Sequence, residues 1–306
     1  MAKNIRKRKM NIYRAFGYYI ESELDIPEFS KTGPNSIDFS IKRQNSVGSK
    51  HDPSRDFMVF HSMDRVELNW ALIGYFEVLN RNLIIAAIRP DCDEGLVRFP
   101  LLGAVMALLL QLNGRLILHA SSTERAGAAA TFLGDKGAGK STTAAAMITG
   151  GHALLSDDVV SVLPKAPPMI FPAYPNVKLA PATAESVGLA GEVRPKVVAP
   201  GLDKDQYIPS ATFQTNPTPA KAFFVLERGL ELSIKQCTAL ESFNYAMRFS
   251  YLRRFGSEVL KDGLGEQILS QCTEIARNSN FYRLTLPEDL KALPKAQEIV
   301  DGILTA

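Results

Sequence analysis

The chain has 306 residues, of which 46% are hydrophobic, 22% charged and 8% aromatic. This composition is that of a folded globular protein, and the length allows one large domain or two ordinary ones. The formal net charge of +3 is too small to indicate a nucleic acid or a membrane surface as the partner.

Cysteine usage indicates a reducing compartment. Cys92, Cys237 and Cys272 are odd in number and far apart, and their spacing fits neither a disulfide framework nor a zinc site. The longest apolar stretch, residues 99–110, is shorter than the about 20 residues that span a bilayer. We therefore expect a cytoplasmic protein whose thiols are reduced.

The first part of the chain predicts short strands. Its β-branched and aromatic residues gather in short runs that polar or turn-prone segments separate. These strands are expected at residues 13–20, 57–60, 66–70 and 83–88. We predict an N-terminal, largely β domain over residues 1–95, ending where Asp, Glu, Pro and Gly cluster.

Residues 96–306 are predicted to form an α/β domain. It opens with a buried helix over residues 99–110, with Pro100 in its first turn. Strands 116–121 and 128–133, helix 140–149, and strands 153–156 and 159–163 are expected next. Loops at 164–175 and 189–210, a hairpin between 222–226 and 230–234, and a helical remainder complete the prediction.

One loop carries the strongest motif. Residues 134–141 read Gly-Asp-Lys-Gly-Ala-Gly-Lys-Ser and match the phosphate-binding pattern G-x-x-x-x-G-K-[ST]. Such a loop directs backbone N–H groups and the positive end of a helix at a polyphosphate. We expect Lys140 to reach the outer phosphates and the Ser141 hydroxyl to reach Mg²⁺. The predicted nucleotide-binding residues are Gly134, Asp135, Lys136, Gly137, Ala138, Gly139, Lys140, Ser141 and Thr142.

Two adjacent acids, Asp157 and Asp158, follow the next predicted strand. A carboxylate at a strand end opposite the phosphates can hold Mg²⁺ or deprotonate an incoming hydroxyl. Neighbouring side chains on an extended chain point to opposite faces, so the two acids are expected to have different roles. The alternative is a solvated Asp-Asp turn.

A single histidine, His119, lies within the apolar strand predicted at 116–121. If this strand neighbours the one that ends in the acids, the imidazole can hydrogen-bond one aspartate. The alternative is a core histidine whose hydrogen bonds are satisfied locally.

These residues together resemble the HPr kinase/phosphorylase family, whose catalytic domain is related to phosphoenolpyruvate carboxykinases. The resemblance is carried by His119-Ala120, the loop 134–141, Gly151-His152 and Asp157-Asp158. It implies a P-loop kinase domain that uses ATP and Mg²⁺ to phosphorylate a serine of a peptide or small protein. The family's loop is usually followed by Glu, whereas Thr142-Thr143 follows here, and its Gly-Arg-Asn-type segment is not found.

The resemblance also implies roles for these residues. Asp157 is expected to be the base toward the serine hydroxyl, with His119 assisting it. Ser141 and Asp158 are expected to support Mg²⁺. Lys140 is expected to neutralise the phosphates and stabilise the leaving oxygen.

Several segments look like a smaller branch of this family, the HPr-kinase-like proteins encoded with lasso-peptide precursors. They include the residues at 13–17, 26–28, 155–160, 171–175 and 225–229. This second resemblance covers nearly the whole chain. It implies that the acceptor is the C-terminal serine of a peptide precursor.

Two other functions stay open at this point. One is an HPr kinase/phosphorylase that acts on the HPr protein, and the other is a nucleotide-gated binding module without chemistry. A homo-oligomer is possible, since HPr kinases assemble. Basic residues that are candidates to hold a product phosphate or a peptide carboxylate are Arg194, Lys196, Lys204, Arg253 and Arg254.

Overall fold

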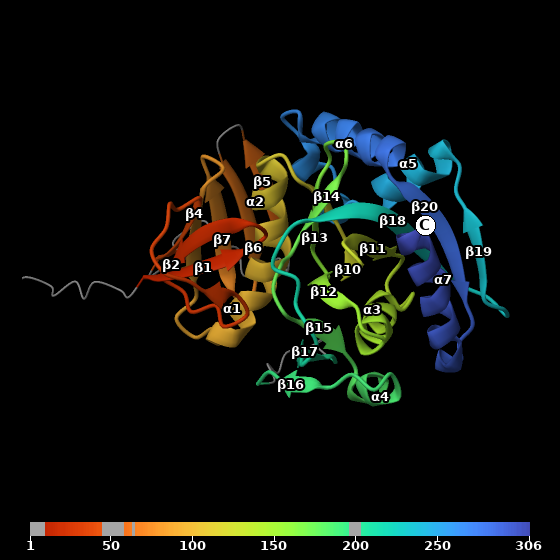
Figure 1. Ribbon diagram of the computed structural model, residues 1–306. Helices are drawn as coiled ribbons and strands as arrows, with labels where there is room; N and C mark the ends of the chain where they lie inside the picture. The colour runs from red at the N-terminus through yellow and green to blue at the C-terminus, as the bar shows by residue number, and fades with distance from the viewer. Residues whose placement is uncertain (1–9, 45–57, 63–64, 196–202) are drawn as a thin grey trace, which may run out of the picture.

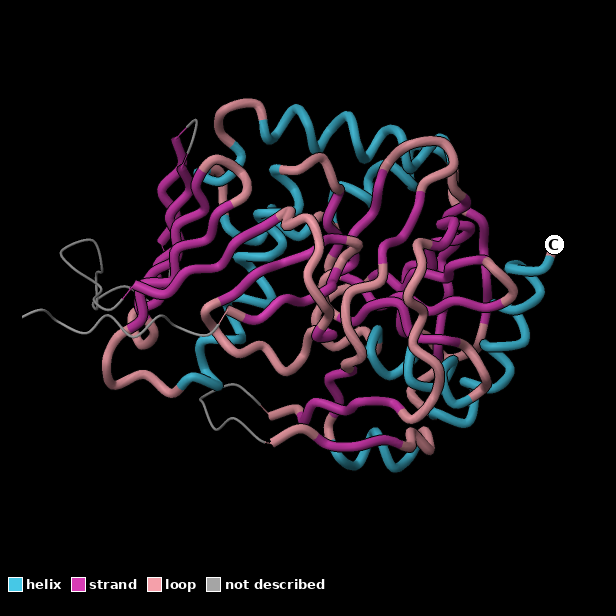
Figure 2. The backbone as a smooth tube through the Cα atoms, turned by 60° about the vertical axis from the view of Figure 1, so that its left-hand side comes forward, coloured by secondary structure: helices cyan, strands magenta, loops and turns pink. Residues whose placement is uncertain are grey.

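The computed structural model describes residues 10–44, 58–62, 65–195 and 203–306. The predicted start of a strand at residue 57 and the candidate Lys196 lie outside these ranges. Within them the protein is a mixed α/β structure with sheets of eight, nine and three strands. Figures 1 and 2 show the eight-stranded sheet on one side and the larger, helix-covered sheet on the other.

The eight-stranded sheet is formed by the N-terminal part of the chain, in the order β3-β1-β2-β4-β8-β7-β6-β5. The predicted single strand at 13–20 is a hairpin instead, because Phe16 (φ 56°) and Gly17 (φ 81°) turn the chain. Strands β3, β4 and β7 were not predicted. The strands are β1 Asn11–Ala15, β2 Tyr18–Ser22, β3 Ser30–Lys31, β4 Phe39–Gln44, β5 Met58–Ser62, β6 Arg65–Trp70, β7 Gly74–Leu79 and β8 Leu83–Ile88.

The predicted apolar helix is longer than expected. It begins after Asp93, whose carboxylate accepts hydrogen bonds from the backbone N–H groups of Gly95 and Leu96. Pro100 does not open it, because the chain continues without a break through α1 Glu94–Pro100, a π-helical segment Leu101–Val105 and α2 Met106–Leu112. A proline removes one backbone donor inside a helix, and a π turn beside it accommodates the interruption.

The described part of the chain contains one helix that is long and apolar enough to cross a membrane, Glu94–Leu112 with 19 residues. The expectation that this apolar stretch is too short therefore does not hold for the whole helix. However, 72% of its most apolar window is buried inside the protein. Its side chains belong to a hydrophobic cluster that also contains residues of both large sheets, as in a core helix.

The large sheet has the order β12-β10-β11-β18-β14-β13-β9, with β20 pairing to β18 and β19 pairing to β20. Strand β18 runs parallel to both β11 and β20. Its strands are β9 Leu116–Leu118, β10 Ala120–Arg125, β11 Ala128–Leu133, β12 Ala153–Asp157, β13 Val160–Leu163, β14 Met169–Phe171, β18 Thr218–Arg228, β19 Ser233–Gln236 and β20 Asn280–Leu286.

Helices cover both faces of this sheet. Helices α3 and α7 share a buried cluster with Phe132 and Phe224 of the sheet, whereas α5 and α6 belong to the cluster that contains Phe223 and Phe281. The helical segments are α3 Lys140–Thr149, α5 Ala239–Arg248, α6 Leu264–Asn278 and α7 Leu293–Thr305, with short 3₁₀ turns at Tyr251–Phe255, Glu258–Leu260 and Leu290–Ala292.

The predicted hairpin between 222–226 and 230–234 is wrong. Strand β19 pairs antiparallel with β20, which lies in the stretch expected to be helical, and not with β18. The predicted loops also contain strands: β14 in the first, and β16 Gly191–Val193 with β17 Asp205–Pro209 in the second. Together with β15 Val177–Leu179 these last two form the small sheet, beside α4 Pro181–Ser186.

Buried aromatic residues connect the two halves of the chain. The backbone N–H of Phe16 donates to the carbonyl of Pro172 at 2.9 Å, and the Phe16 ring packs edge-on against Tyr174. Phe29 also packs against Tyr174. The division into domains at residue 95 stays a prediction, since one hydrophobic cluster extends across it.

Candidate active site

The phosphate-binding motif lies between β11 and α3, so the strand–loop–helix context expected from the sequence is confirmed. Gly137 (φ 85°) and Gly139 (φ 98°) adopt left-handed backbone conformations that favour glycine. A Cβ added at Gly139 would approach the Arg228 guanidinium to 3.0 Å. The loop therefore presents its backbone at the positive end of α3.

Lys140, the first residue of α3, is buried in this loop. Its Nζ donates to the backbone carbonyls of Gly134 at 2.8 Å and Asp135 at 3.1 Å. Burial lowers the pKa of Lys140, and the negative charges of Asp157 and Asp158 only partly offset this effect. An ammonium group therefore stands at the base of the loop, within electrostatic reach of both acids.

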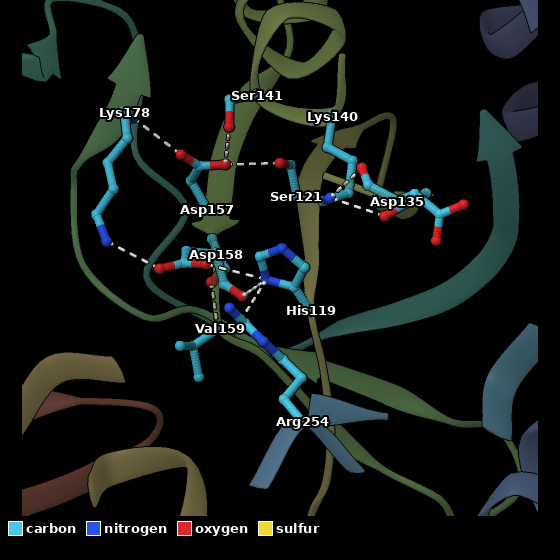
Figure 3. Close-up of polar contacts among 12 residues, drawn as sticks. His119, Ser121, Asp135, Lys140, Ser141, Asp157, Asp158, Val159, Lys178 and Arg254 are labelled. Carbon is cyan, nitrogen blue, oxygen red and sulfur yellow. Dashed lines mark hydrogen bonds and ion pairs between the residues drawn. The ribbon is translucent and has the colours of Figure 1, made fainter. Parts of the chain in front are cut away.

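Asp157 ends strand β12 and is 6% exposed. Its Oδ1 accepts hydrogen bonds from Ser141 Oγ at 2.9 Å and from Ser121 Oγ at 2.6 Å (Figure 3). Its Oδ2 accepts from the backbone N–H of Lys178 at 2.9 Å. The structure therefore joins Asp157 to the hydroxyl that was predicted to face Mg²⁺.

The oxygens of Ser141 and Asp157 fit a magnesium ion. Mg²⁺ is held in kinase-like sites by one or two protein oxygens together with substrate phosphates and water. Among the described residues there is no group of three or more His, Cys, Asp or Glu side chains that could hold a metal by itself. The oxygens of Ser141 and Asp157 therefore fit a magnesium ion that is held jointly with the phosphates of a bound nucleotide.

Asp158 follows the end of β12 with φ 78°, and its side chain is directed away from Ser141 (Figure 3). Its Oδ1 lies 3.0 Å from Nδ1 of His119, and its Oδ2 accepts from Nζ of Lys178 at 2.8 Å. Burial alone would raise the pKa of Asp158. The positive charge of Lys178 and the hydrogen bond with His119 outweigh burial and hold that pKa well below its usual range.

His119 lies between β9 and β10, where the predicted continuous strand is interrupted. Its side chain is 26% exposed and packs edge-on against Tyr251, so it is not an enclosed core residue. Nδ1 also lies 3.4 Å from Nη1 of Arg254. The sequence predicts that His119 assists Asp157, whereas the structure places the imidazole against Asp158.

These groups border one cleft of about 600 Å³. Of the basic candidates, Lys204 and Arg254 also border it, as does Arg228, which was not a candidate. Arg253 instead donates to the Met247 carbonyl. The cleft is lined by Phe99, His119, Ser121, Lys136, Gly137, Gly139, Lys140, Ser141, Thr142, Asp157, Asp158, Lys178, Asp203, Lys204, Gln206, Arg228 and Arg254.

Two residues of the acid cluster were missed from the sequence. Lys178 is a single lysine in a three-residue strand, and nothing local in its segment distinguishes it. Ser121 lies two residues after His119 in a strand that was predicted, but a serine in a strand carries no signal by itself. The Ser121 contact arises because β10 pairs with β12, and the Lys178 contact arises because β15 of the small sheet reaches the end of β12.

No family model matches the sequence, and a search of curated proteins finds no match. Among solved structures, the chain is similar to the Hpr(Ser) kinase/phosphatase from Coxiella burnetii. The TM-score is 0.30 and the sequence identity 11%, over 61% of this chain and 94% of that chain. We therefore infer the function from the residues of the cleft.

Proposed function

We propose that the protein is an ATP- and Mg²⁺-dependent kinase that phosphorylates a serine of a peptide. One observation carries this proposal: the phosphate-loop residues Lys140 and Ser141 and the two acids converge on a single cleft. A solvated Asp-Asp turn is not compatible with this arrangement, because both acids accept hydrogen bonds from protein groups.

The phosphate loop would bind the triphosphate through its backbone N–H groups. Lys140 would exchange its two carbonyl partners for phosphate oxygens and neutralise the charge on the leaving oxygen. Ser141 and Asp157 would hold Mg²⁺, which supplies charge neutralisation to the phosphates when it is bound. Phosphoryl transfer needs mostly positioning and electrostatic stabilisation, which these groups provide.

Asp158 would act as the base. The hydroxyl oxygen of the acceptor forms a bond to the γ-phosphorus while the bond from phosphorus to the β–γ bridging oxygen breaks, and ADP leaves. The hydroxyl proton passes to the Asp158 carboxylate, which is ionised at neutral pH because its pKa lies well below the usual range. His119 and Lys178 position that carboxylate.

This division of roles reverses the one implied by the family resemblance. In that resemblance Asp157 was the base and Asp158 supported Mg²⁺. We assign the metal to Asp157 because it contacts Ser141, and proton transfer to Asp158 because it contacts His119.

The acceptor would be the C-terminal serine of a peptide precursor. The sequence resemblance to kinases encoded with lasso-peptide precursors supports this acceptor. The acceptor would then be a flexible chain end rather than a folded protein.

Transfer of label from γ-³³P-ATP tests the proposal directly. The full chain is incubated with Mg²⁺ and a pool of short peptides ending in serine, and with HPr in a separate reaction. We expect Mg²⁺-dependent phosphoserine in the peptide pool and none with Lys140→Ala. Binding of ATP without transfer to either acceptor would support the nucleotide-gated binding module instead. Transfer to HPr alone would favour the HPr kinase.

A further inference from the structure

A second, smaller cavity of about 150 Å³ adjoins the catalytic cleft. Three residues, Phe99, Lys178 and Gln206, line both spaces. The cavity is much smaller than the about 300–1,000 Å³ of a typical ligand pocket, so it fits a small chemical group rather than a nucleotide. Its wall is built from both halves of the chain, with Glu28 from the N-terminal part, Arg98 from α1, and Arg194 directly after β16.

The polar groups of this wall are incompletely paired. Glu28 is only 3% exposed, and its Oε1 accepts from Nε of Arg98 at 3.1 Å. Its Oε2 is buried and has no hydrogen-bond partner among the described residues. Arg194 donates through Nη1 to the Pro27 carbonyl at 3.1 Å, while its buried Nε also lacks a partner there. Buried polar atoms without partners are costly, which indicates that a ligand completes them.

The charges around the cavity leave a positive excess. Arg98 and Arg194 face the single carboxylate of Glu28, whereas Lys178 is matched by Asp158. Burial lowers the pKa of Arg194, as expected for a cation with too little compensating charge. One monoanion would balance this set, and guanidinium groups bind carboxylates through paired N–H donors.

The cavity is also next to the proposed base. The Nζ of Lys178 lies 2.8 Å from Oδ2 of Asp158, and the same side chain borders the cavity. A group held beside Arg98 and Arg194 is therefore separated from the base by about one side chain.

We propose that this cavity binds a carboxylate of the peptide acceptor, adjacent to the serine that is phosphorylated; the inference rests on the proposed kinase function. The carboxylate pairs with Arg98 and Arg194, and a backbone N–H of the same peptide donates to Oε2 of Glu28. The carboxylate comes either from the end of the peptide chain or from an acidic side chain next to the serine. Either source would fix the distance between the anion and the hydroxyl at Asp158.

Binding can be measured without ATP by ligand-observed NMR on the full chain. The probes are N-acetylserine, which has a free carboxylate, and N-acetylserinamide, which has none. We expect N-acetylserine to bind at least about tenfold more tightly, since a charge-assisted pair is lost in the amide. Equal affinities for the two probes would overturn the proposal.

A third probe, the α-amide of N-acetylaspartic acid, identifies the source of the carboxylate. Binding as tight as that of N-acetylserine supports the carboxylate site and shows that it accepts an acidic side chain as well as a chain end. Weaker binding of this probe than of N-acetylserine supports the site and assigns the carboxylate to the chain end.

Arg194→Ala is the first variant, because it removes a cation without leaving a buried carboxylate unpaired. Arg98→Lys is the second, since Arg98→Ala would strand the buried Glu28 and could prevent folding. We expect Arg194→Ala to abolish the preference for the acid, and Arg98→Lys to weaken it. Arg277→Ala, which replaces an exposed arginine of α6, is the matched control and should keep the preference for N-acetylserine over its amide. An unchanged preference in Arg194→Ala would overturn the proposal.

Failure of the kinase function gives a different pattern. If no acceptor is phosphorylated but N-acetylserine is still preferred over its amide, the cavity is a carboxylate site and the kinase proposal fails. If peptides that end in serine amide and contain no acidic side chain are phosphorylated with the same kcat/KM as the corresponding free acids, the kinase proposal stands and the carboxylate site is wrong.

Discussion

Lys178 contacts Asp158 through its side chain and Asp157 through its backbone: Nζ lies 2.8 Å from Oδ2 of Asp158, and its N–H donates to Oδ2 of Asp157 at 2.9 Å. One residue therefore contacts both acids through different groups. Asp157 is directed to Ser141 and Asp158 to His119. This separation allows the two carboxylates to be tested independently.

Asp158→Asn is expected to remove the base. The kcat of phosphoryl transfer should fall by about 10²–10⁴-fold, as for loss of a positioned base, with the KM for ATP nearly unchanged. Steady-state kinetics with a peptide acceptor, together with ATP binding by calorimetry, give both quantities. A turnover number within about twofold of the unsubstituted protein would exclude Asp158 as the base.

Asp157→Asn is expected to act on Mg²⁺ instead. The concentration of Mg²⁺ needed for half-maximal activity should rise by about 10–100-fold, the range seen when groups that support a metal are replaced. Activity is titrated with Mg²⁺ at saturating ATP in both variants. The reverse outcome, a changed Mg²⁺ requirement in Asp158→Asn only, would restore the roles implied by the family resemblance.

Lys140→Ala is expected to abolish incorporation of phosphate into the acceptor. The ammonium lies at the base of the phosphate loop, and alanine cannot replace its charge. Lys165→Ala, at an exposed lysine outside the cleft, is the matched control and should retain full activity. Since Lys140 also holds two loop carbonyls, circular dichroism and thermal unfolding show whether the variant is folded. A folded Lys140→Ala protein that still transfers phosphate would contradict the proposed site.

His119→Ala tests whether the imidazole acts through Asp158. If it only positions that carboxylate, kcat should fall by about tenfold while the KM for ATP stays constant, and the loss should vanish when Asp158 is already asparagine. A double-mutant cycle of His119→Ala and Asp158→Asn measures this coupling. Additive losses would mean that His119 acts on the reaction by a route that does not involve Asp158.

The phosphate loop could be predicted from the sequence because its information is local. Strand β11, the loop and helix α3 are consecutive, and their residues fix their own conformations. The acids could also be placed at the end of the next strand. The sequence could not predict that Asp157 faces Ser141 and Asp158 faces His119. This arrangement depends on the left-handed conformation of Asp158 and on Lys178 from another strand.

Long-range strand pairing explains the other differences. Strand β18 was expected to fold back on the next strand, but it lies between β11 and β20, which are distant in the sequence. Nothing in the alternation of its residues encodes those neighbours. For the same reason Glu28 and Arg194, far apart in the chain, gave no sign of a shared cavity.

His152 links α7 to the large sheet. Its Nε2 lies 2.8 Å from Oδ1 of Asp301 and its Nδ1 lies 3.2 Å from Oγ1 of Thr123. Burial lowers the pKa of His152, and the hydrogen bond and charge of Asp301 offset this only in part. The folded protein therefore favours the neutral imidazole.

This lowered pKa gives a pH dependence of defined sign. Above about pH 6.5, the pKa of histidine in the unfolded chain, His152 is neutral in both the folded and the unfolded protein. Its full contribution to the free energy of unfolding is then present. As the pH falls below that value, His152 takes up a proton in the unfolded chain but not in the folded protein. The contribution of His152 to the free energy of unfolding therefore falls, until the pH passes the pKa of His152 in the folded protein. One such group changes that free energy by at most about 1.4 kcal/mol per pH unit.

His152→Gln should remove this dependence. At pH 7.5 the substitution is expected to lower the free energy of unfolding by about 1–3 kcal/mol, because buried partners lose a hydrogen bond. Between pH 6.5 and 5.5 the difference between the two proteins should shrink, since only the unsubstituted protein loses the His152 contribution. Urea unfolding at these pH values measures both free energies. A difference that stays constant over this range would mean that the pKa of His152 is not lowered by folding.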